Sequence, residues 1–274
     1  MTFYNEIDML SDNYLQRFSG LSRIYGLPAL THLHQARFCI VGVGGVGSWA
    51  AEAAARSGIG HITLIDHDDI EITNTNRQLH TLQDTLGLSK VETIAARVMN
   101  INPECDCVAI DDLVTHANLE KFNFKQFDYV IDAIDHVQQK MALVHYLRRN
   151  KVRLVSTGGA GGLTDPTRIE VVDLTRTFND PLLAKMRANF RQQMGYSRNP
   201  KRRYGIDCVY STQQPLYPAE QGCVSYAKPG TDQQTTLDCN TGLGSFVGVT
   251  ACFGFTAISH SINKYLKSKD KQSL

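Results

Sequence analysis

The sequence has almost no excess of charge of either sign. Its 274 residues include 28 Lys and Arg against 27 Asp and Glu, a formal net charge of +1 at pH 7. This balance argues against a protein that coats nucleic acid with its whole surface, and leaves room for a local basic patch. The first 18 residues contain acids and no apolar core segment, so we expect no secretory signal.

Cysteine pairs with metal-binding spacing are also missing. No C-x-x-C occurs, so a structural zinc site with the usual ligand spacing is not expected. An odd, scattered set of cysteines is typical of a reducing cytoplasm rather than of a disulfide framework. Cys239 precedes a predicted helix start and is the candidate for a reactive thiol, although a structural role is favoured. The seven cysteines are residues 39, 105, 107, 208, 223, 239 and 252.

Only one long segment lacks charge. Residues 239–263 contain no Asp, Glu, Lys or Arg, but glycine, threonine, serine and His260 dilute their apolar character. We therefore expect a buried, closely packed helix rather than a membrane span. The segment that follows, KSKDKQSL (267–274), predicts a flexible solvated tail.

Short apolar strands alternate with helical segments through the first half. Strands are predicted over 37–43, 61–66, 107–110, 127–135 and 153–159, and helices over 46–57, 89–100 and 137–150. This order predicts an α/β fold with a Rossmann-like, doubly wound and mostly parallel sheet. Later segments predict an antiparallel extension in the second half: strands at 167–175 and 207–211, and a helix near 180–195.

A glycine-rich turn follows the first predicted strand. Gly42, Gly44, Gly45 and Gly47 let the backbone turn tightly and approach a phosphate, whose charge the helix N-terminus stabilises. Asp66 ends the next strand, where a carboxylate would meet a ribose hydroxyl. Together they predict a ribose-bearing nucleotide, for which NAD is the default ligand.

The following residues favour ATP over NAD. The run NTNRQ supplies Asn74, Asn76, Arg77 and Gln78, and Lys90 lies at the start of the next predicted helix. Two cations beside the glycine loop suit a triphosphate and its departing pyrophosphate. A nicotinamide ring would instead need a flat apolar pocket, so an NAD-dependent dehydrogenase is disfavoured.

Two carboxylates lie near the end of the fourth predicted strand. Open α/β sheets bind ligands at the carboxyl ends of their strands, so Asp135 is favoured as a ligand of Mg²⁺ that bridges phosphates. Asp132 lies within the strand, where we expect it to satisfy neighbouring backbone groups.

The stretch 185–205 contains many cations and no acid. Phe190, Tyr196 and Tyr204 lie between the cations, which predicts binding of an RNA backbone with stacking of bases. The alternative is a mobile, solvated loop. The candidate RNA-binding residues are Lys185, Arg187, Arg191, Arg198, Lys201, Arg202 and Arg203.

Five motifs in order resemble the ubiquitin-activating, E1-like adenylating enzymes: G-x-G-G-x-G, D-x-D, N-x-N-R-Q, G-x-x-K and D-x-x-D. The resemblance implies binding of ATP and Mg²⁺ and attack of a carboxylate on the α-phosphate to give an acyl-adenylate. It assigns catalysis to Arg77, Lys90 and Asp135, with an amino-terminal arginine donated to the partner subunit's ATP, here Arg17 with Arg23 as its rival. Beside the four glycines it assigns these residues to the nucleotide: Asp66, Asp68, Asn74, Asn76, Arg77, Gln78 and Lys90.

The stretches STGGAGG (156–162) and VYSTQQP (209–215) resemble one branch of this family, which dehydrates N6-threonylcarbamoyladenosine in tRNA. The branch implies adenylation of the threonyl carboxylate, attack by a neighbouring group and release of AMP. It also implies a homodimer and association with a cysteine desulfurase and its sulfur-accepting partner. It does not decide whether the fold binds a monovalent cation. A carrier-protein activator is the alternative, although the two C-x-x-C pairs usual in sulfur-carrier activators are missing. A non-catalytic nucleotide-sensing adaptor is a third reading.

The resemblance also predicts the domain organisation. The chain has no internal repeat and no low-complexity linker, so we expect a single E1-like ATP-binding domain over 1–266. It would comprise a helical lead-in (1–35) broken at Gly20 and Gly26, a nucleotide-binding core (36–160) and an elaboration for substrate and dimer contacts (161–266).

Overall fold

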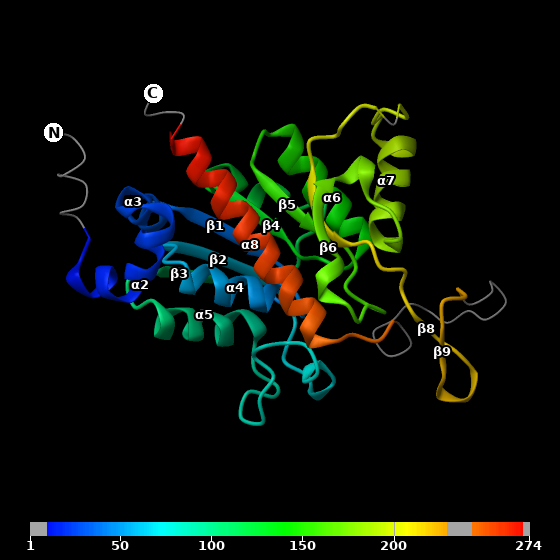
Figure 1. Cartoon of the computed structure of the whole chain (residues 1–274), viewed down its shortest axis with the longest axis horizontal. Coiled ribbons are helices and arrows are strands. Elements are labelled where there is room, and N and C mark those ends of the chain that lie inside the picture. Colours follow the sequence, from blue (N-terminus) through cyan, green and yellow to red (C-terminus); the bar gives the residue numbers. More distant parts are fainter. Residues whose placement is uncertain (1–9, 200, 229–242, 271–274) are drawn as a thin grey trace.

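A seven-stranded sheet forms the centre of the computed structural model, which describes residues 10–199, 201–228 and 243–270 (Figure 1). The strand order is β3-β2-β1-β4-β5-β7-β6, and every neighbouring pair is parallel except β6 and β7. The predicted parallel sheet and its antiparallel extension are therefore confirmed. The strands are β1 (Arg37–Val41), β2 (His61–Asp66), β3 (Asp106–Asp111), β4 (Tyr129–Asp132), β5 (Leu154–Thr157), β6 (Ile169–Asp173) and β7 (Asp207–Ser211).

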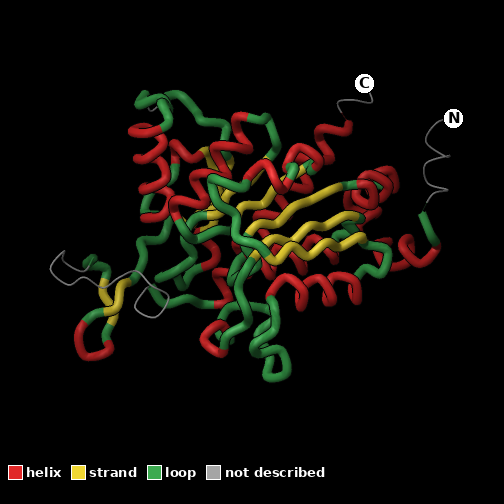
Figure 2. The backbone as a smooth tube through the Cα atoms, turned by 180° about the vertical axis from the view of Figure 1, so that it is seen from behind, coloured by secondary structure: helices red, strands yellow, loops and turns green. Residues whose placement is uncertain are grey.

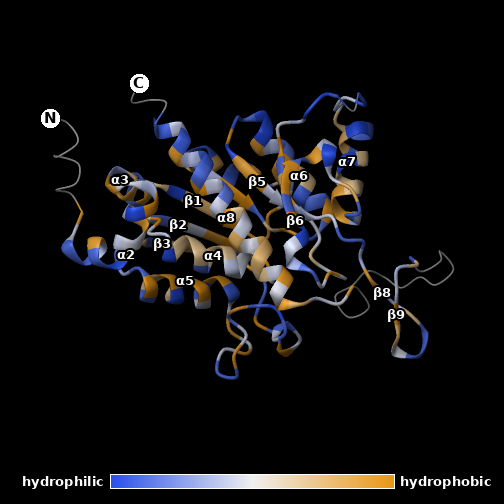
Figure 3. Cartoon of the chain, in the orientation of Figure 1, coloured by the Kyte–Doolittle hydropathy of each residue, from blue (hydrophilic) through white to orange (hydrophobic). Residues whose placement is uncertain are grey.

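Helices cover both faces of the sheet. One face packs against α4 (Gly47–Arg56), α5 (Lys90–Ile101) and α8 (Val247–Asp270), and the other against α6 (Val137–Arg149) and α7 (Pro181–Gln193). The central strands are mostly hydrophobic because they are buried on both faces, whereas the helices carry both kinds of residue (Figure 3). Helices α4 and α8 approach closely, since a Cβ on Gly254 would lie 2.5 Å from the Val46 carbonyl oxygen.

The helical lead-in forms α2 (Asp12–Tyr25) and α3 (Leu27–Gln35). The predicted break at Gly20 is wrong, because α2 continues through this residue, where a side chain would meet only open space. The break at Gly26 is confirmed: its φ of 84° is a conformation that favours glycine. The buried Tyr14 hydroxyl donates to the Gly58 carbonyl and joins α2 to the end of α4.

The predicted uncharged helix corresponds to α8, which begins at Val247 and continues to Asp270. Residues 267–270 are therefore helical rather than part of a tail, and the remainder of that predicted tail lies outside the described residues. The candidate reactive thiol, Cys239, also lies outside them. Within the described ranges, no helix has the length and apolar character that crossing a membrane requires.

Short elements complete the second half and the connections. The hairpin of β8 (Tyr217–Pro218) and β9 (Val224–Ser225) projects from the body of the molecule (Figure 2). The 3-10 helices are η1 (Ile72–Asn74), η2 (Leu119–Phe122), η3 (Phe124–Gln126), η4 (Pro166–Arg168), η5 (Leu174–Arg176) and η6 (Glu220–Gly222).

Candidate nucleotide-binding and adenylation site

A cleft of about 1270 Å³ opens at the carboxyl ends of the parallel strands. The glycine turn, the segment after β2, the start of α5 and the loops after β4 and β5 form its walls. Strands β4 and β5 end earlier than predicted, at Asp132 and Thr157, because the chain there turns into two of these loops. The cleft contains most of the residues predicted to bind the nucleotide.

The four glycines of the turn have two different roles. At Gly42, whose φ is 85°, a Cβ would lie 2.9 Å from the Ala133 carbonyl oxygen, and at Gly47 it would lie 1.7 Å from the Gly42 carbonyl oxygen. These two glycines are required by the turn itself. Gly44 and Gly45 line the cleft, and a Cβ there would meet side chains rather than backbone, with Gln78 and Arg77 nearest at 3.7 and 3.3 Å. A Cβ on Gly45 would also lie 3.6 Å from the Thr250 methyl group, so the missing side chains leave room for a phosphate.

Asp66 joins the end of β2 to the glycine turn. Its Oδ2 accepts a hydrogen bond of 2.6 Å from the Val43 amide, and its Oδ1 accepts from the amides of His67 and Asp68 at 2.8 and 3.0 Å. The carboxylate therefore holds the turn in place and also lines the cleft. Its contact with ribose stays a prediction.

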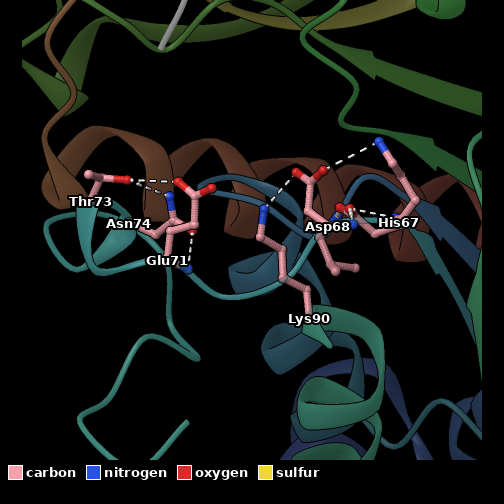
Figure 4. A network of polar contacts seen from close by, with 8 residues as sticks. His67, Asp68, Glu71, Thr73, Asn74 and Lys90 are labelled. Carbon is pink, nitrogen blue, oxygen red and sulfur yellow. Dashed lines mark hydrogen bonds and ion pairs between the residues drawn. The ribbon is translucent and has the colours of Figure 1, made fainter. Parts of the chain in front are cut away.

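Lys90 and Asp68 form an ion pair in the cleft wall (Figure 4). The Lys90 Nζ lies 2.7 Å from the Asp68 Oδ2, and the lysine side chain is only 6% exposed whereas that of Asp68 is 52% exposed. Because the aspartate pairs with the lysine, it positions that cation at the edge of the cleft. Its predicted direct contact with the nucleotide stays a prediction.

The segment that contains NTNRQ is shaped by its own side chains. Asn74 is buried, and its Oδ1 accepts from the Glu71 amide at 3.1 Å. Asn76 donates to the Ser245 carbonyl at 2.7 Å, which ties the segment to the residues before α8. Arg77 donates through Nη1 to the Thr73 carbonyl and to the Asn76 Oδ1, at 2.8 and 2.9 Å. Its other guanidinium N–H groups have no partner among the described residues and could bind an anion in the cleft.

Several buried polar atoms behind this segment have no partner in the part of the chain that the structure describes. Among them are the Gln78 Oε1 and both ring nitrogens of His80. Burial, followed by the nearby Lys90 charge, lowers the pKa of His80 to about 4, so its ring is neutral at physiological pH. The sequence pattern identified Gln78 but not His80. The one feature of the sequence that could have pointed to His80 is its position two residues after NTNRQ.

A buried ion pair supports the turn that carries Asp135. The Lys140 Nζ lies 2.8 Å from the Asp132 Oδ2, both side chains are 0% exposed, and the lysine also donates to the Ile134 carbonyl at 2.8 Å. Asp132 accepts from the Ile134 amide at 3.2 Å, as the sequence predicted, and from the Ser156 hydroxyl at 2.6 Å. Asp135 itself is exposed and lines the cleft. Its role as a Mg²⁺ ligand stays a prediction.

Lys140 was missed by the sequence reasoning. The sequence could have identified it, because this lysine lies on the same face of the predicted helix as the apolar residues Val137, Met141 and Val144. A second missed residue is Asp180, which is buried at the start of α7 and accepts from the amides of Gly159 and Leu183, at 3.0 and 2.9 Å. Burial raises the pKa of Asp180. This carboxylate holds the loop after β5 against α7.

The structure does not bring the candidate amino-terminal arginines to the cleft of their own chain. Arg17 and Arg23 are exposed on α2, and the Arg17 Nη1 donates to the Ile101 carbonyl at 3.4 Å, at the far end of α5 from Lys90. Neither lines the cleft.

The basic stretch 185–205 divides into structural and exposed cations. Arg187 donates to the Thr177 hydroxyl and carbonyl at 2.6 and 3.1 Å, and burial lowers its pKa. Arg191 donates to the Tyr204 hydroxyl at 2.9 Å. These two arginines stabilise the fold around α7. The exposed cations are Lys185, Arg198, Lys201, Arg202 and Arg203.

The predicted use of the aromatic residues in this stretch for stacking on bases is wrong. Phe190 and Tyr196 stack on each other with ring centroids 4.6 Å apart, and Tyr204 contacts Tyr196 at 4.9 Å. Phe190 and Tyr204 are buried. The rings pack together because they bury more apolar area against α6 and α7 than they would on the surface.

The fold and cleft define a Rossmann-like nucleotide-binding protein whose cations suit a triphosphate. Residues 15–273 match the ThiF family, and the chain belongs to that family. The resemblance to E1-like adenylating enzymes is thereby confirmed.

Two bacterial relatives match nearly the whole chain. It is 49% identical to tRNA threonylcarbamoyladenosine dehydratase of Escherichia coli (strain K12), over 96% of this chain and 98% of that protein. The dehydratase of Haemophilus influenzae is 48% identical, over 94% and 96%. Adenylyltransferase and sulfurtransferase MOCS3 of Culex quinquefasciatus is 32% identical, over only 51% of this chain and 32% of that protein.

Solved structures agree with these matches. The crystal structure of E. coli tRNA N6-threonylcarbamoyladenosine dehydratase, TcdA, in complex with ATP has a TM-score of 0.86 at 47% identity, and covers 96% of this chain and 99% of that one. Its complex with AMP has a TM-score of 0.84 at 48% identity, over 95% and 98%. The similarity includes the elaborated second half as well as the nucleotide-binding core.

Proposed function

We propose that this protein catalyses the ATP-dependent dehydration of N6-threonylcarbamoyladenosine in tRNA. The observation that carries the proposal is the match to two bacterial dehydratases along almost the entire chain. The cleft alone supports adenylation in general, because a glycine turn, Arg77 and Lys90 suit any ATP-dependent activation of a carboxylate. The activator of a carrier protein is not favoured, since MOCS3 is similar over only about half of the chain.

The reaction depends on stabilisation of the negative charge on the phosphates more than on a nucleophile supplied by the protein. A threonyl carboxylate oxygen attacks the α-phosphorus of ATP, and the bond to pyrophosphate breaks. A neighbouring group of the same modification then attacks the carbonyl carbon, and AMP leaves with the former carboxylate oxygen, so the nucleoside loses one water in total. Arg77 and Lys90 oppose the charge that develops on the phosphates, and Gly44 and Gly45 admit them to the turn.

The residues of the cleft also suit a divalent cation. Asp135 is exposed to the cleft on a turn held by the buried Lys140. A Mg²⁺ ion held by its carboxylate would neutralise phosphate charge there. Asp66, His67 and Asp68 offer further ligand atoms within 4.8 Å of one another, although Asp68 pairs with Lys90.

A homodimer is part of the proposal. Exposed apolar side chains lie on the segment between β2 and α5 and near the start of α8, and the Asn76–Ser245 hydrogen bond joins these two regions. A second copy would cover this surface. It would also explain why Arg17 does not line its own cleft. The exposed residues are Ile72, Leu82, Leu88, Phe246, Val247 and Phe255.

The proposal includes tRNA as a partner, a sulfur-transfer assembly and a cytoplasmic location. Exposed cations of the stretch 185–205 suit the phosphates of tRNA. The free cysteines of the described residues suit a reducing cytoplasm. Association with a cysteine desulfurase and its sulfur-accepting partner is proposed from the family resemblance.

The central test supplies ATP, Mg²⁺ and tRNA that carries the threonylcarbamoyl modification. We expect AMP to form and the nucleoside to lose the mass of one water. Formation of AMP only after addition of a small protein that ends in Gly-Gly would establish the carrier-activating alternative instead. ATP binding without turnover would support the adaptor.

The dimer has its own test. Arg17→Ala and Arg77→Ala variants would each lose turnover, whereas a mixture of the two would form some dimers with one intact site. Recovery of part of the activity on mixing is the expected result. If the mixture stays inactive although light scattering shows a dimer, Arg17 does not act on the partner's cleft.

A further inference from the structure

A second pocket, of about 560 Å³, lies away from the nucleotide cleft. It is formed by the residues that follow β3, by the carboxyl-terminal half of α6 and by the residues that end α7. Its volume is within the range of sites that hold a nucleotide-sized ligand. Leu119, Ala142 and Met194 contribute apolar surface to it.

The polar part of the pocket holds one cation, Arg149, and one carboxylate, Glu120. Arg149 is exposed, and its side chain forms no hydrogen bond or ion pair with the described part of the chain. The acid that lines the pocket, Glu120, accepts a hydrogen bond of 2.8 Å from the Tyr146 hydroxyl. An unpaired guanidinium at the rim of a partly apolar pocket is suited to a phosphate.

His145 supplies a flat ring in the same pocket. Burial, followed by the nearby charges of Arg149 and His116, lowers the pKa of His145, so the ring is mostly neutral at pH 7. A neutral imidazole that is half-buried offers a face for stacking and a polar edge for hydrogen bonding. The positive charge in the pocket therefore comes from Arg149.

The pocket is continuous with the basic stretch. The His145 Nδ1 lies 3.3 Å from the Tyr196 hydroxyl, and the Arg148 Nε donates to the Tyr204 carbonyl at 2.8 Å. The loop that carries Arg198 and residues 201–203 is thus held against the end of α6. An RNA strand that follows these exposed cations would reach the pocket.

We propose that this pocket binds one nucleotide of the RNA substrate. Its base packs on the apolar floor and the ring of His145, and its phosphate pairs with Arg149. The inference rests on the proposed function, because it takes the substrate to be a tRNA. Helix α6 starts beside the cleft at Val137, and its 13 residues span about 20 Å. The bound nucleotide is therefore a different one from the modified adenosine, which would react in the cleft.

Binding of tRNA to the full chain at several salt concentrations tests the pocket. We expect Arg149→Ala to weaken tRNA binding and to reduce the slope of log Kd against log salt by about 1. Arg149→Lys should keep the slope, since it keeps the charge. His145→Ala should weaken binding by about fivefold or more, because stacking on the ring is lost. Lys267→Ala is the matched control, since it removes an exposed cation from α8, on the opposite face of the sheet.

The site in the tRNA can be mapped independently. Photocrosslinking with tRNA that carries 4-thiouridine should label peptides with residues 145–149 or 193–196. Kinetically, the loss in Arg149→Ala should appear in the KM for tRNA more than in kcat.

The two proposals fail in different ways. If Arg149→Ala binds tRNA like Lys267→Ala, with the same salt slope, or if crosslinks map only to the cleft, the pocket does not bind RNA. If the wild-type protein neither binds nor dehydrates modified tRNA, the proposed function itself is overturned, whatever the variants do.

Discussion

Replacement of Lys140 by methionine would test how the cleft is supported. The substitution keeps an apolar stem of similar length but removes the ammonium group from a site that is 0% exposed. Asp132 would remain buried, and its partners among the described residues would be the Ser156 hydroxyl and the Ile134 amide. Removal of one member of a buried ion pair costs about 3–5 kcal/mol, because the other charge is left uncompensated. We therefore expect the free energy of unfolding to fall by about this amount.

The same substitution should affect catalysis. The Ile134 carbonyl loses its donor, and this carbonyl belongs to the turn that carries Asp135. We expect the rate of AMP formation to fall and its dependence on Mg²⁺ to shift to higher concentration, because the carboxylate is less well positioned. Urea denaturation followed by circular dichroism would measure stability, and release of AMP at varied Mg²⁺ would measure catalysis.

Two further variants make the test decisive. Lys121→Met removes a lysine whose pair with Asp112 is largely exposed, so solvent screening should leave stability nearly unchanged. Adding Asp132→Asn to Lys140→Met removes both buried charges and should recover part of the lost stability. If Lys140→Met is as stable as Lys121→Met, the buried pair does not support the turn as argued.

Two other predictions concern the cleft, and a third concerns an ion pair between β7 and α8 outside it. Arg77→Ala should lower kcat for AMP formation by about 100-fold with unchanged stability in urea, because it removes charge stabilisation near the transferred phosphate; a change confined to KM would contradict this role. Gly47→Ala should fail to fold stably, since its Cβ would overlap the Gly42 carbonyl oxygen, whereas Gly44→Ala should fold and bind ATP more weakly in calorimetry; equal stability of the two would contradict the division of roles. The hydrogen bond from His260 and the nearby Lys264 lower the pKa of Asp207 against the effect of burial, so its contribution to stability is present above about pH 4 and is lost as the pH falls through the lowered value. When the pH is lowered from 5 to near 3, the free energy of unfolding of Asp207→Asn should thus fall by less than that of the wild type. Urea unfolding at each pH would measure this difference. If both proteins show the same pH dependence, the Asp207–His260 pair contributes nothing to stability.

The sequence alone determined the strands, the helices and the nucleotide motif, because each of these depends on residues that are close together along the chain. Apolar runs bounded by glycines and acids predicted the parallel strands, because such strands are buried on both faces. The glycine turn, Asp66 and Lys90 predicted a nucleotide site, because each lies at the end of a strand or the start of a helix in a Rossmann-like unit, and Arg77 in the connection between β2 and α5 added a second cation. The cleft contains all four of these features.

The tertiary structure decided which of the polar and aromatic side chains are available to a ligand. Arg187 and Arg198 look alike in the sequence, but one is satisfied by the residues after η5 and the other is exposed. Phe190 could have faced RNA, but it stacks on Tyr196. Lys140 supports the cleft through a carboxylate on another element. Local periodicity places a residue on an element, whereas its partners come from segments distant along the chain and are set only when the layers pack together.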